Sequence, residues 1–207
     1  MLAVVLTLAP VLGLAACTET PSVVRISPTA PASPAAEPPA APNPPLAAAK
    51  RAAGIPDCPP SSPTTAAVPD GLPDATLPCL GGGREVRLAG LRGKPMIVNL
   101  WAQWCAPCRQ EAPYLAEVAG SSTVQVLGVD HADPQPELAV RFAADAAWRY
   151  PQLYDSRKVL GSALQITAIP QTLFVRADGT IAYRNTVPFR SADQIRALAR
   201  THLGVAP

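Results

Sequence analysis

The stretch that decides the fold is P-M-I-V-N-L-W-A-Q-W-C-A-P-C-R-Q-E-A-P, residues 95–113. It begins with an apolar run, Met96–Trp101, whose length and β-branched content predict a buried strand. A C-x-x-C pair, Cys105 and Cys108, follows at the start of a segment that can be helical. At a helix start, unpaired N–H groups and the positive end of the helix dipole favour the thiolate of the first cysteine. The pattern therefore suits reversible dithiol–disulfide exchange.

The W-C-x-x-C pattern after this strand resembles the active site of the thioredoxin superfamily. The longer string W-C-A-P-C-R-Q-E-A-P is most similar to the extracytoplasmic TlpA/ResA-like branch, where a Glu often follows the second Cys by three residues and a Pro lies two further on. Glu111 and Pro113 match these positions, and the resemblance covers about residues 76–203. It implies an α/β, thioredoxin-like fold: a central mixed sheet flanked by helices, with an N-terminal hairpin and an inserted helix. Taken alone, the motif also suits half of a zinc site or a structural bridge.

The resemblance implies roles for five residues. Cys105 would attack the substrate disulfide, and Cys108 would resolve the mixed disulfide. Trp104 would cover the site, and Pro170 would be a cis proline opposite the two cysteines. The backbone of Ile169, just before that proline, would pair with the substrate chain. We expect no metal and no cofactor other than the Cys105–Cys108 disulfide itself.

Glu111 is the candidate proton acceptor. Thioredoxin itself uses a buried Asp six residues before the first Cys, and this chain has Asn99 there, which does not titrate. Glu111 follows Cys108 by one helical turn, and burial would raise its pKa toward the working range. The alternative is a solvated helix residue that pairs with Arg109 or Lys94.

Proline separates the chain into an N-terminal part and an ordinary domain. Of the 26 prolines, 16 lie between residues 18 and 80, and nine lie after residue 80. Residues 18–56 are rich in Ala and Pro and show no apolar periodicity, so they cannot bury enough surface to offset chain entropy. We therefore expect a disordered tether at residues 18–56 and the thioredoxin-like domain at residues 57–207.

Residues 1–17 predict a lipoprotein signal peptide. They are apolar and uncharged, and they end in Leu14-Ala15-Ala16-Cys17, which resembles the lipobox of bacterial lipoproteins. Cys17 would then become the lipidated N-terminus and anchor the protein to the membrane. No Lys or Arg precedes Cys17, where an export signal usually carries a basic segment. The alternative is a buried apolar segment with a chance cysteine.

Two further cysteines, Cys58 and Cys79, bracket a second proline-rich piece. If Cys17 is lipidated, an even four cysteines remain. In an oxidising compartment, Cys58 and Cys79 most simply form a structural disulfide. The alternatives are free thiols, a second redox pair, or a four-cysteine zinc site shared with Cys105 and Cys108.

The remaining segments predict the element order β-α-β-α-α-β-β-α for the core of the domain. After the first strand and helix we expect a strand at 123–129, a helix capped by Asp133, a short helix at 158–164, strands at 168–175 and 180–185, and a last helix capped by Ser191. The helix after Asp133 would bury Leu138, Phe142 and Ala146. His131 is expected in a surface loop.

The leading functional interpretation is a lipid-anchored, extracytoplasmic thiol-disulfide reductase. By resemblance, such proteins commonly serve cytochrome c maturation by reducing haem-binding cysteines, and they receive electrons from a membrane donor of the CcdA/DsbD type. The alternatives are an oxidant that introduces disulfides into exported proteins and a non-catalytic binding lipoprotein. The net charge of +2, with 15% charged residues, does not indicate a nucleic-acid partner. We expect a monomer.

Overall fold

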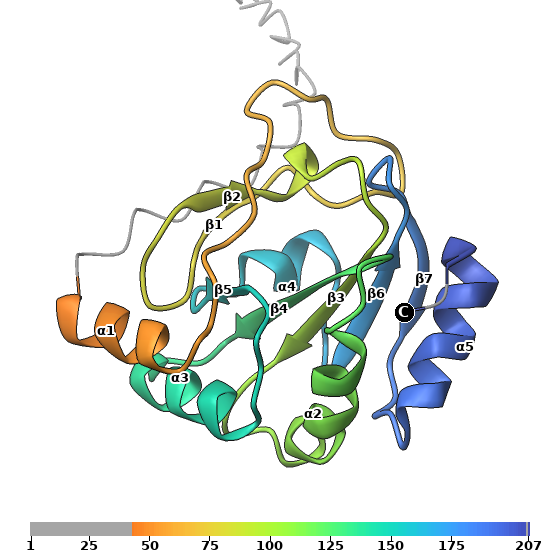
Figure 1. The fold of residues 1–207 in the computed structure, drawn as a ribbon. Coiled ribbons are helices and arrows are strands. Elements are labelled where there is room, and N and C mark those ends of the chain that lie inside the picture. The colour runs from red at the N-terminus through yellow and green to blue at the C-terminus, as the bar shows by residue number, and fades with distance from the viewer. Residues whose placement is uncertain (1–42, 206) are drawn as a thin grey trace, which may run out of the picture. The chain divides into compact units, whose positions relative to one another are not determined.

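The apolar run forms the middle strand of a five-stranded sheet with the order β5-β4-β3-β6-β7 (Figure 1). The structure is a computed structural model, and it describes residues 43–205 and 207. β4 runs parallel to β3 and β5 parallel to β4, whereas β6 and β7 are each antiparallel to their neighbour. The strands are β3 (Met96–Trp101), β4 (Gln125–His131), β5 (Gln152–Asp155), β6 (Gln171–Val175) and β7 (Ile181–Asn185).

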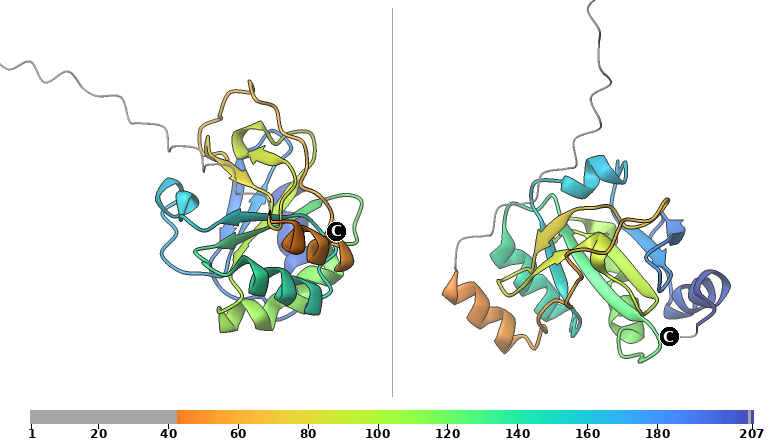
Figure 2. Two further views of the ribbon diagram at one scale, coloured as in Figure 1. Left: turned by 90° about the vertical axis from the view of Figure 1, so that its left-hand side faces the viewer. Right: turned by 90° about the horizontal axis from the view of Figure 1, so that it is seen from above.

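Both faces of this sheet are covered, which explains why every residue of β3 is buried. Ile97 and Trp101 point to the face that packs on three helices, α2 (Ala106–Val118), α3 (Pro136–Asp145) and α5 (Ala192–Leu203). Val98 and Leu100 point to the opposite face, which packs on α4 (Val159–Ala163) and on the antiparallel hairpin of β1 (Thr76–Pro78) and β2 (Glu85–Arg87). A 3-10 turn, Leu88–Gly90, follows the hairpin. Figures 1 and 2 show α2 and α5 on one side of the sheet and α4 on the other.

This architecture confirms the expected mixed sheet flanked by helices, and it contains a hairpin before β3 and a helix, α3, between β4 and β5. In the part of the chain that the structure describes, the helices are too short or too polar to cross a membrane.

Three details of the expected order were wrong. The order omitted β5, which lies between α3 and α4. β4 is displaced by two residues from the expected 123–129, so that it includes His131. α3 begins at Pro136 with Gln135 as N-cap, because the Asp133 carboxylate accepts a hydrogen bond from the Gln135 amide instead of capping the first turn itself. Leu138 of this helix is exposed, whereas Phe142 is buried as expected.

The expected extent of the tether was also wrong, because residues 44–52 form a helix, α1 (Pro44–Ala52). The Asn43 side chain accepts a hydrogen bond from the Leu46 amide and caps the first turn. A helix this short is marginal alone. It is stabilised by packing against α3 and by burial of Leu46 and Lys50. Residues 53–56 of the expected tether are also described, and Ile55 among them is buried. The rest of the expected tether, residues 18–42, and the lipobox at Cys17 lie outside the described residues.

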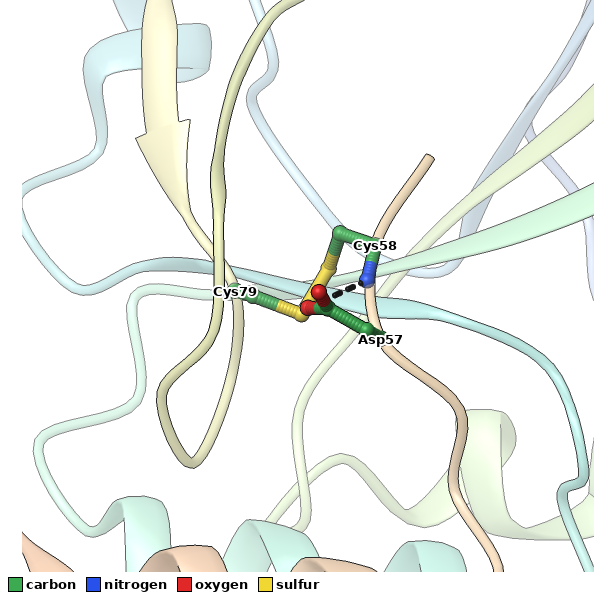
Figure 3. Close-up of side chains that lie close together, drawn as sticks. All are labelled: Asp57, Cys58 and Cys79. Carbon is green, nitrogen blue, oxygen red and sulfur yellow. Dashed lines mark hydrogen bonds between the residues drawn. A yellow bond between two sulfur atoms is a disulfide. The ribbon is translucent and has the colours of Figure 1, made fainter. Parts of the chain in front are cut away.

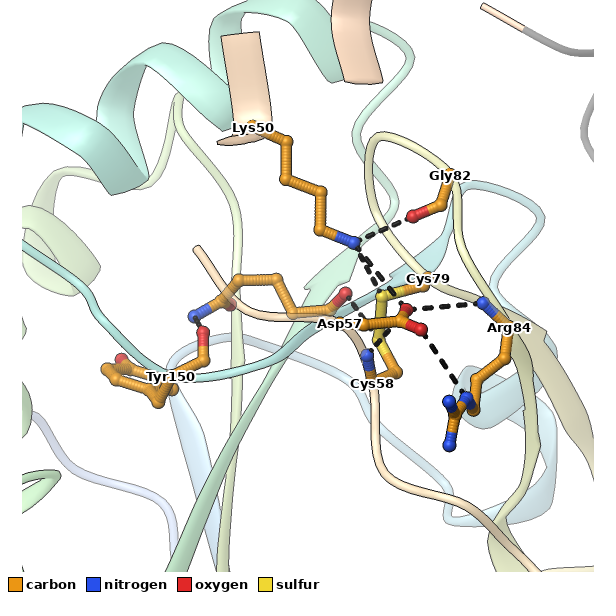
Figure 4. The surroundings of a disulfide bond; sticks show 8 residues. Lys50, Asp57, Cys58, Cys79, Gly82, Arg84 and Tyr150 are labelled. Atoms are coloured by element: carbon orange, nitrogen blue, oxygen red, sulfur yellow. Dashed lines mark hydrogen bonds and ion pairs between the residues drawn. A yellow bond between two sulfur atoms is a disulfide. The ribbon is translucent and has the colours of Figure 1, made fainter. Parts of the chain in front are cut away.

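A disulfide joins Cys58 to Cys79, with the Cα atoms 5.8 Å apart (Figure 3). The Lys50 ammonium donates to Cys79 Sγ at 3.0 Å and to the Gly82 carbonyl at 2.7 Å, and it lies 3.9 Å from the Asp57 carboxylate (Figure 4). Burial lowers the pKa of Lys50, and the Asp57 charge opposes that shift. The disulfide and Lys50 together fasten α1 and the following segment to the hairpin.

We expect the Cys58–Cys79 disulfide to remain closed in a mild reductant that fully opens Cys105–Cys108. Structural disulfides have potentials below about −300 mV, and a cross-link that closes a loop of this size stabilises by about 3 kcal/mol on the chain-entropy model. Cys105 instead lies at a helix start, which favours its thiolate and hence its reduced form. Alkylation and mass spectrometry across a dithiothreitol series would measure both pairs.

The control is a Cys105→Ser/Cys108→Ser variant, in which the same series should show no opening at mild potentials. Opening of both pairs together in the native chain would contradict a structural role, as would stoichiometric zinc in the purified protein.

Candidate active site

The Cys105–Cys108 disulfide lies at the N-terminus of α2, where the chain turns away from the end of β3. Cys105 is the N-cap of the helix, and the Cys108 amide donates to Cys105 Sγ at 3.2 Å. Cys105 is 4% exposed and Cys108 only 1%. A sulfur that accepts an amide hydrogen bond at a helix start is well placed to carry negative charge. Cys105 therefore has the better environment for a thiolate and the better access.

The loop before β6 faces this disulfide. Cys105 Sγ lies 3.7 Å from the carbonyl oxygen of Ile169. The peptide bond between Ile169 and Pro170 is cis, as the resemblance implies. Trp104, immediately before Cys105, is 54% exposed. The structure thus brings four of the expected site residues, Trp104, Cys105, Ile169 and Pro170, to one place.

Glu111 is fully buried beneath the disulfide, one helical turn after Cys108. Its Oε1 accepts a hydrogen bond from Asn99 Nδ2 at 2.9 Å, and its Oε2 accepts one from the Phe189 amide at 3.0 Å. Burial raises the pKa of Glu111 to about 7, and the two hydrogen bonds partly oppose this rise. The alternative of a solvated residue paired with Arg109 or Lys94 is wrong.

Asp130 is a second buried carboxyl at this end of the sheet, and it was not predicted from sequence as a site residue. It lies on β4 directly beside Trp101 of β3 and is fully buried. Neither oxygen accepts a hydrogen bond from any described residue. Burial raises the pKa of Asp130 to about 9, and the nearby carboxyl groups of Asp133 and Asp155 act in the same direction. At neutral pH Asp130 is therefore protonated.

Asp133 connects this buried region to the loop that carries Cys105. Its Oδ2 accepts a hydrogen bond from the Gln103 amide at 3.1 Å, and Tyr154 donates to its carbonyl at 3.0 Å. Arg109 holds the same loop from the other side, because its Nη1 donates to the Gln103 carbonyl at 3.3 Å. The available sequence signal for a buried carboxyl here was an aspartate directly after the apolar run V-L-G-V.

His131 is buried, so its expected surface position was wrong. Its Nδ1 lies 2.7 Å from Asp155 Oδ2, and Asp155 also accepts hydrogen bonds from the first amides of α4, those of Val159 and Leu160. The pair therefore fixes the start of α4 to the end of β4. The shared zinc site is also wrong for this structure, because the four cysteines form two separate disulfides.

The fold and the C-x-x-C site define a thioredoxin-like protein. The chain belongs to the AhpC/TSA family, whose model matches residues 68–184.

Three known proteins illustrate the relationship. A thiol:disulfide interchange protein DsbE of Pseudomonas fluorescens biotype C is 34% identical over 53% of this chain and 61% of its own length. A thiol-disulfide oxidoreductase ResA of Geobacillus thermodenitrificans is 31% identical over 57% of this chain and 68% of its own. The structure of a secreted thiol-disulfide isomerase from Corynebacterium glutamicum superimposes with a TM-score of 0.56 at 26% identity, covering 65% of this chain and 86% of that one. The chain thus spans about three fifths of the DsbE relative.

The raised pKa of Asp130 predicts the pH dependence of stability. The pKa of this carboxyl is about 9 in the folded protein and 3.8 in the unfolded chain. Its contribution to the free energy of unfolding is therefore complete below pH 3.8 and is lost as pH rises toward 9. Asp130→Asn has nearly the size and shape of the protonated carboxyl but does not ionise. Relative to the native chain, the variant should gain free energy of unfolding from pH 5 to pH 8, by at most about 1.4 kcal/mol per pH unit.

Urea denaturation at several pH values would measure this difference. Asp145→Asn, at an exposed position on α3, is the matched control and should show no such trend. A pH-independent difference for Asp130→Asn would mean that Asp130 is already ionised in the folded protein at pH 5.

Proposed function

We propose that this protein is a thiol-disulfide oxidoreductase that reduces specific protein disulfides. The observation that carries the proposal is the Cys105–Cys108 disulfide at the start of α2, with Cys105 Sγ facing the carbonyl before the cis proline. The names of the Pseudomonas and Geobacillus relatives support the same activity. A non-catalytic binding protein would not need both cysteines of the pair.

In the first step the Cys105 thiolate attacks one sulfur of the substrate disulfide. A mixed disulfide forms, and the second substrate sulfur leaves as a thiolate that takes up a proton. The helix start and the Cys108 amide lower the cost of negative charge on Cys105. The Ile169 carbonyl and the exposed Trp104 are proposed to contact the substrate chain on either side of the reacting sulfur.

In the second step Cys108 attacks the Cys105 sulfur, which closes the disulfide and releases the reduced substrate. Two electrons have then passed from the dithiol to the substrate. Cys108 must lose its proton while it is buried, where a thiolate is disfavoured. Glu111, one turn away with a pKa of about 7, is the proposed proton acceptor.

The direction of electron flow distinguishes this reductase from the alternative, an oxidant of exported proteins. Reduction potentials of such proteins span about 150 mV, from about −270 mV for thioredoxin to about −120 mV for the strongest oxidant. Equilibration of Cys105–Cys108 with a glutathione series would place the protein on this scale. A value near the thioredoxin end supports the reductase, and a value near the oxidant end supports the alternative.

We further propose an extracytoplasmic, lipid-anchored monomer that acts in cytochrome c maturation. Two disulfides in the described chain suit an oxidising compartment, and the Corynebacterium neighbour is described as secreted. The lipobox at Cys17 would supply the anchor. The haem-binding cysteines of apocytochrome c would be the substrate, and a membrane protein of the CcdA/DsbD type would return the electrons.

The pKa of Glu111 predicts how the second step depends on pH. Glu111 accepts a proton only when ionised, so the rate of mixed-disulfide resolution should rise with pH through about 7. Glu111→Gln should remove this rise and slow resolution by up to about 10²-fold. Attack by Cys105 should be nearly unchanged. Stopped-flow measurement of both steps between pH 5 and pH 9 would test this.

Asn99→Ala is the control, because Asn99 contacts the same carboxyl but does not titrate. It should lower the free energy of unfolding and keep the pH-dependent limb, shifted to higher pH because the Asn99 hydrogen bond that lowers the Glu111 pKa is lost. Superimposable profiles for the native chain and Glu111→Gln would show that Glu111 takes no part in the proton transfer.

The anchor gives a separate prediction. Cys17→Ala should release the protein from the membrane fraction, while the purified variant reduces disulfides as fast as the native chain. Cell fractionation with immunoblotting would measure the first effect. Mass spectrometry of the mature native protein should find a lipidated N-terminal cysteine, and an unprocessed N-terminus would contradict the proposal.

A further inference from the structure

A groove lies between α3 and α2, the helix whose N-cap is Cys105. The two helices are neighbours in Figures 1 and 2. The groove has a volume of about 570 Å³, and we call it the α2–α3 groove. Its lining includes Gln103, Arg109, Pro113, Leu138, Arg141 and Phe142. Two of these residues flank the redox pair in sequence, because Gln103 precedes Cys105 by two residues and Arg109 follows Cys108 directly.

Positive charge predominates among its lining residues. Arg109 is held in place, with its guanidinium 5.2 Å from the centre of the Phe142 ring and its Nη1 bonded to the Gln103 carbonyl. Arg141 is exposed and forms no ion pair with any residue in the described part of the chain. Asp145 is the one carboxylate among the lining residues. A guanidinium without a partner, beside a second that is already oriented, favours a carboxylate ligand.

The groove also offers features that suit a polypeptide. Leu138 is 39% exposed, although most large apolar side chains of the described chain are buried. Pro113 has no amide N–H to donate to the Arg109 carbonyl four residues earlier, so that carbonyl lacks its usual helix donor, and both residues line the groove. An extended chain would thus meet an apolar wall, a backbone acceptor and two cations.

We propose that the α2–α3 groove binds an acidic segment of the substrate polypeptide, adjacent in sequence to the disulfide that Cys105 attacks. This inference rests on the proposed oxidoreductase function and adds the class of its substrate. Arg141 would pair with a substrate carboxylate, and Leu138 would cover neighbouring apolar atoms. Since neither side chain is placed at the reacting sulfurs, the groove should affect KM and leave kcat nearly unchanged.

The test uses two synthetic peptides that contain the same intramolecular disulfide and differ only in their flanks, one rich in Asp and Glu and the other in Lys. Native reduced protein should show the higher kcat/KM for the acidic peptide. Arg141→Glu should lower that value about 10-fold through KM and raise the value for the Lys peptide. The preference should weaken in high salt, because exposed charges are screened. Arg141→Gln should lie between the two.

Arg176→Glu is the matched control. Arg176 is exposed and follows Val175, which pairs with Met96 at the start of β3, so it lies at the end of the sheet opposite to Cys105. This variant should leave kcat/KM unchanged for both peptides. Equal kcat/KM for the two peptides with native protein, or an equal effect of Arg141→Glu on both, would overturn the proposed groove function.

Two further measurements separate the groove from the oxidoreductase function. Reduction of hydroxyethyl disulfide, which is small and uncharged, reports the redox pair alone and should be unaffected by Arg141→Glu. Fluorescence anisotropy with Cys→Ser versions of the peptides reports binding without turnover. Tighter binding of the acidic peptide, lost in Arg141→Glu, supports the groove whether or not the protein reduces disulfides, whereas binding without preference overturns it.

Discussion

The hydrogen bonds accepted by the buried Glu111 carboxyl are the interaction on which the site depends. They join α2 to Asn99 on the middle strand and to the Phe189 backbone after β7. Hydrogen bonds to a charged group stabilise by about 1.5–3 kcal/mol each, while burial of an unpaired carboxylate costs considerably more. These two effects oppose each other, and the pKa of Glu111 is about 7. At neutral pH its neutral and ionised forms are therefore similar in free energy. A group in this balance takes up and releases a proton at little cost.

The same end of the sheet holds a second set of buried polar groups, and these fix the backbone before Cys105. Asp133 accepts a hydrogen bond from the Gln103 amide, Arg109 donates one to the Gln103 carbonyl, and the buried Asp130 carboxyl lies near Asp133. The peptide groups on both sides of one residue are thus held by side chains from different elements. A loop restrained in this way presents its sulfur in a fixed geometry, which reduces the reorganisation that a reaction requires.

The central strand, the C-x-x-C helix and the last hairpin were predictable because their signals are local: an apolar run, a cysteine spacing and a turn. β5 was not, since its four residues include Gln152 and Asp155, whose burial depends on partners distant in sequence, Trp101 and His131. His131 was expected on the surface for the same reason, because its buried partner Asp155 is distant in sequence. α1 has little intrinsic stability, and its helical state follows from contacts with α3 that sequence periodicity does not report. The cysteine pair and Glu111 were identified as site residues from sequence, whereas Asp130 required the register of β3 with β4.

β5 is one edge of the five-stranded sheet, and the segment around Cys79 lies along it. Cys79 pairs with Leu153, and the Leu80 amide donates to the Gln152 carbonyl at 2.8 Å. An uncovered edge strand is a template on which other chains can add. Here the covering segment is held by a covalent bond that forms only after synthesis. Without the disulfide, the covering segment would keep only its hydrogen bonds along β5, and the sheet edge would be easier to expose.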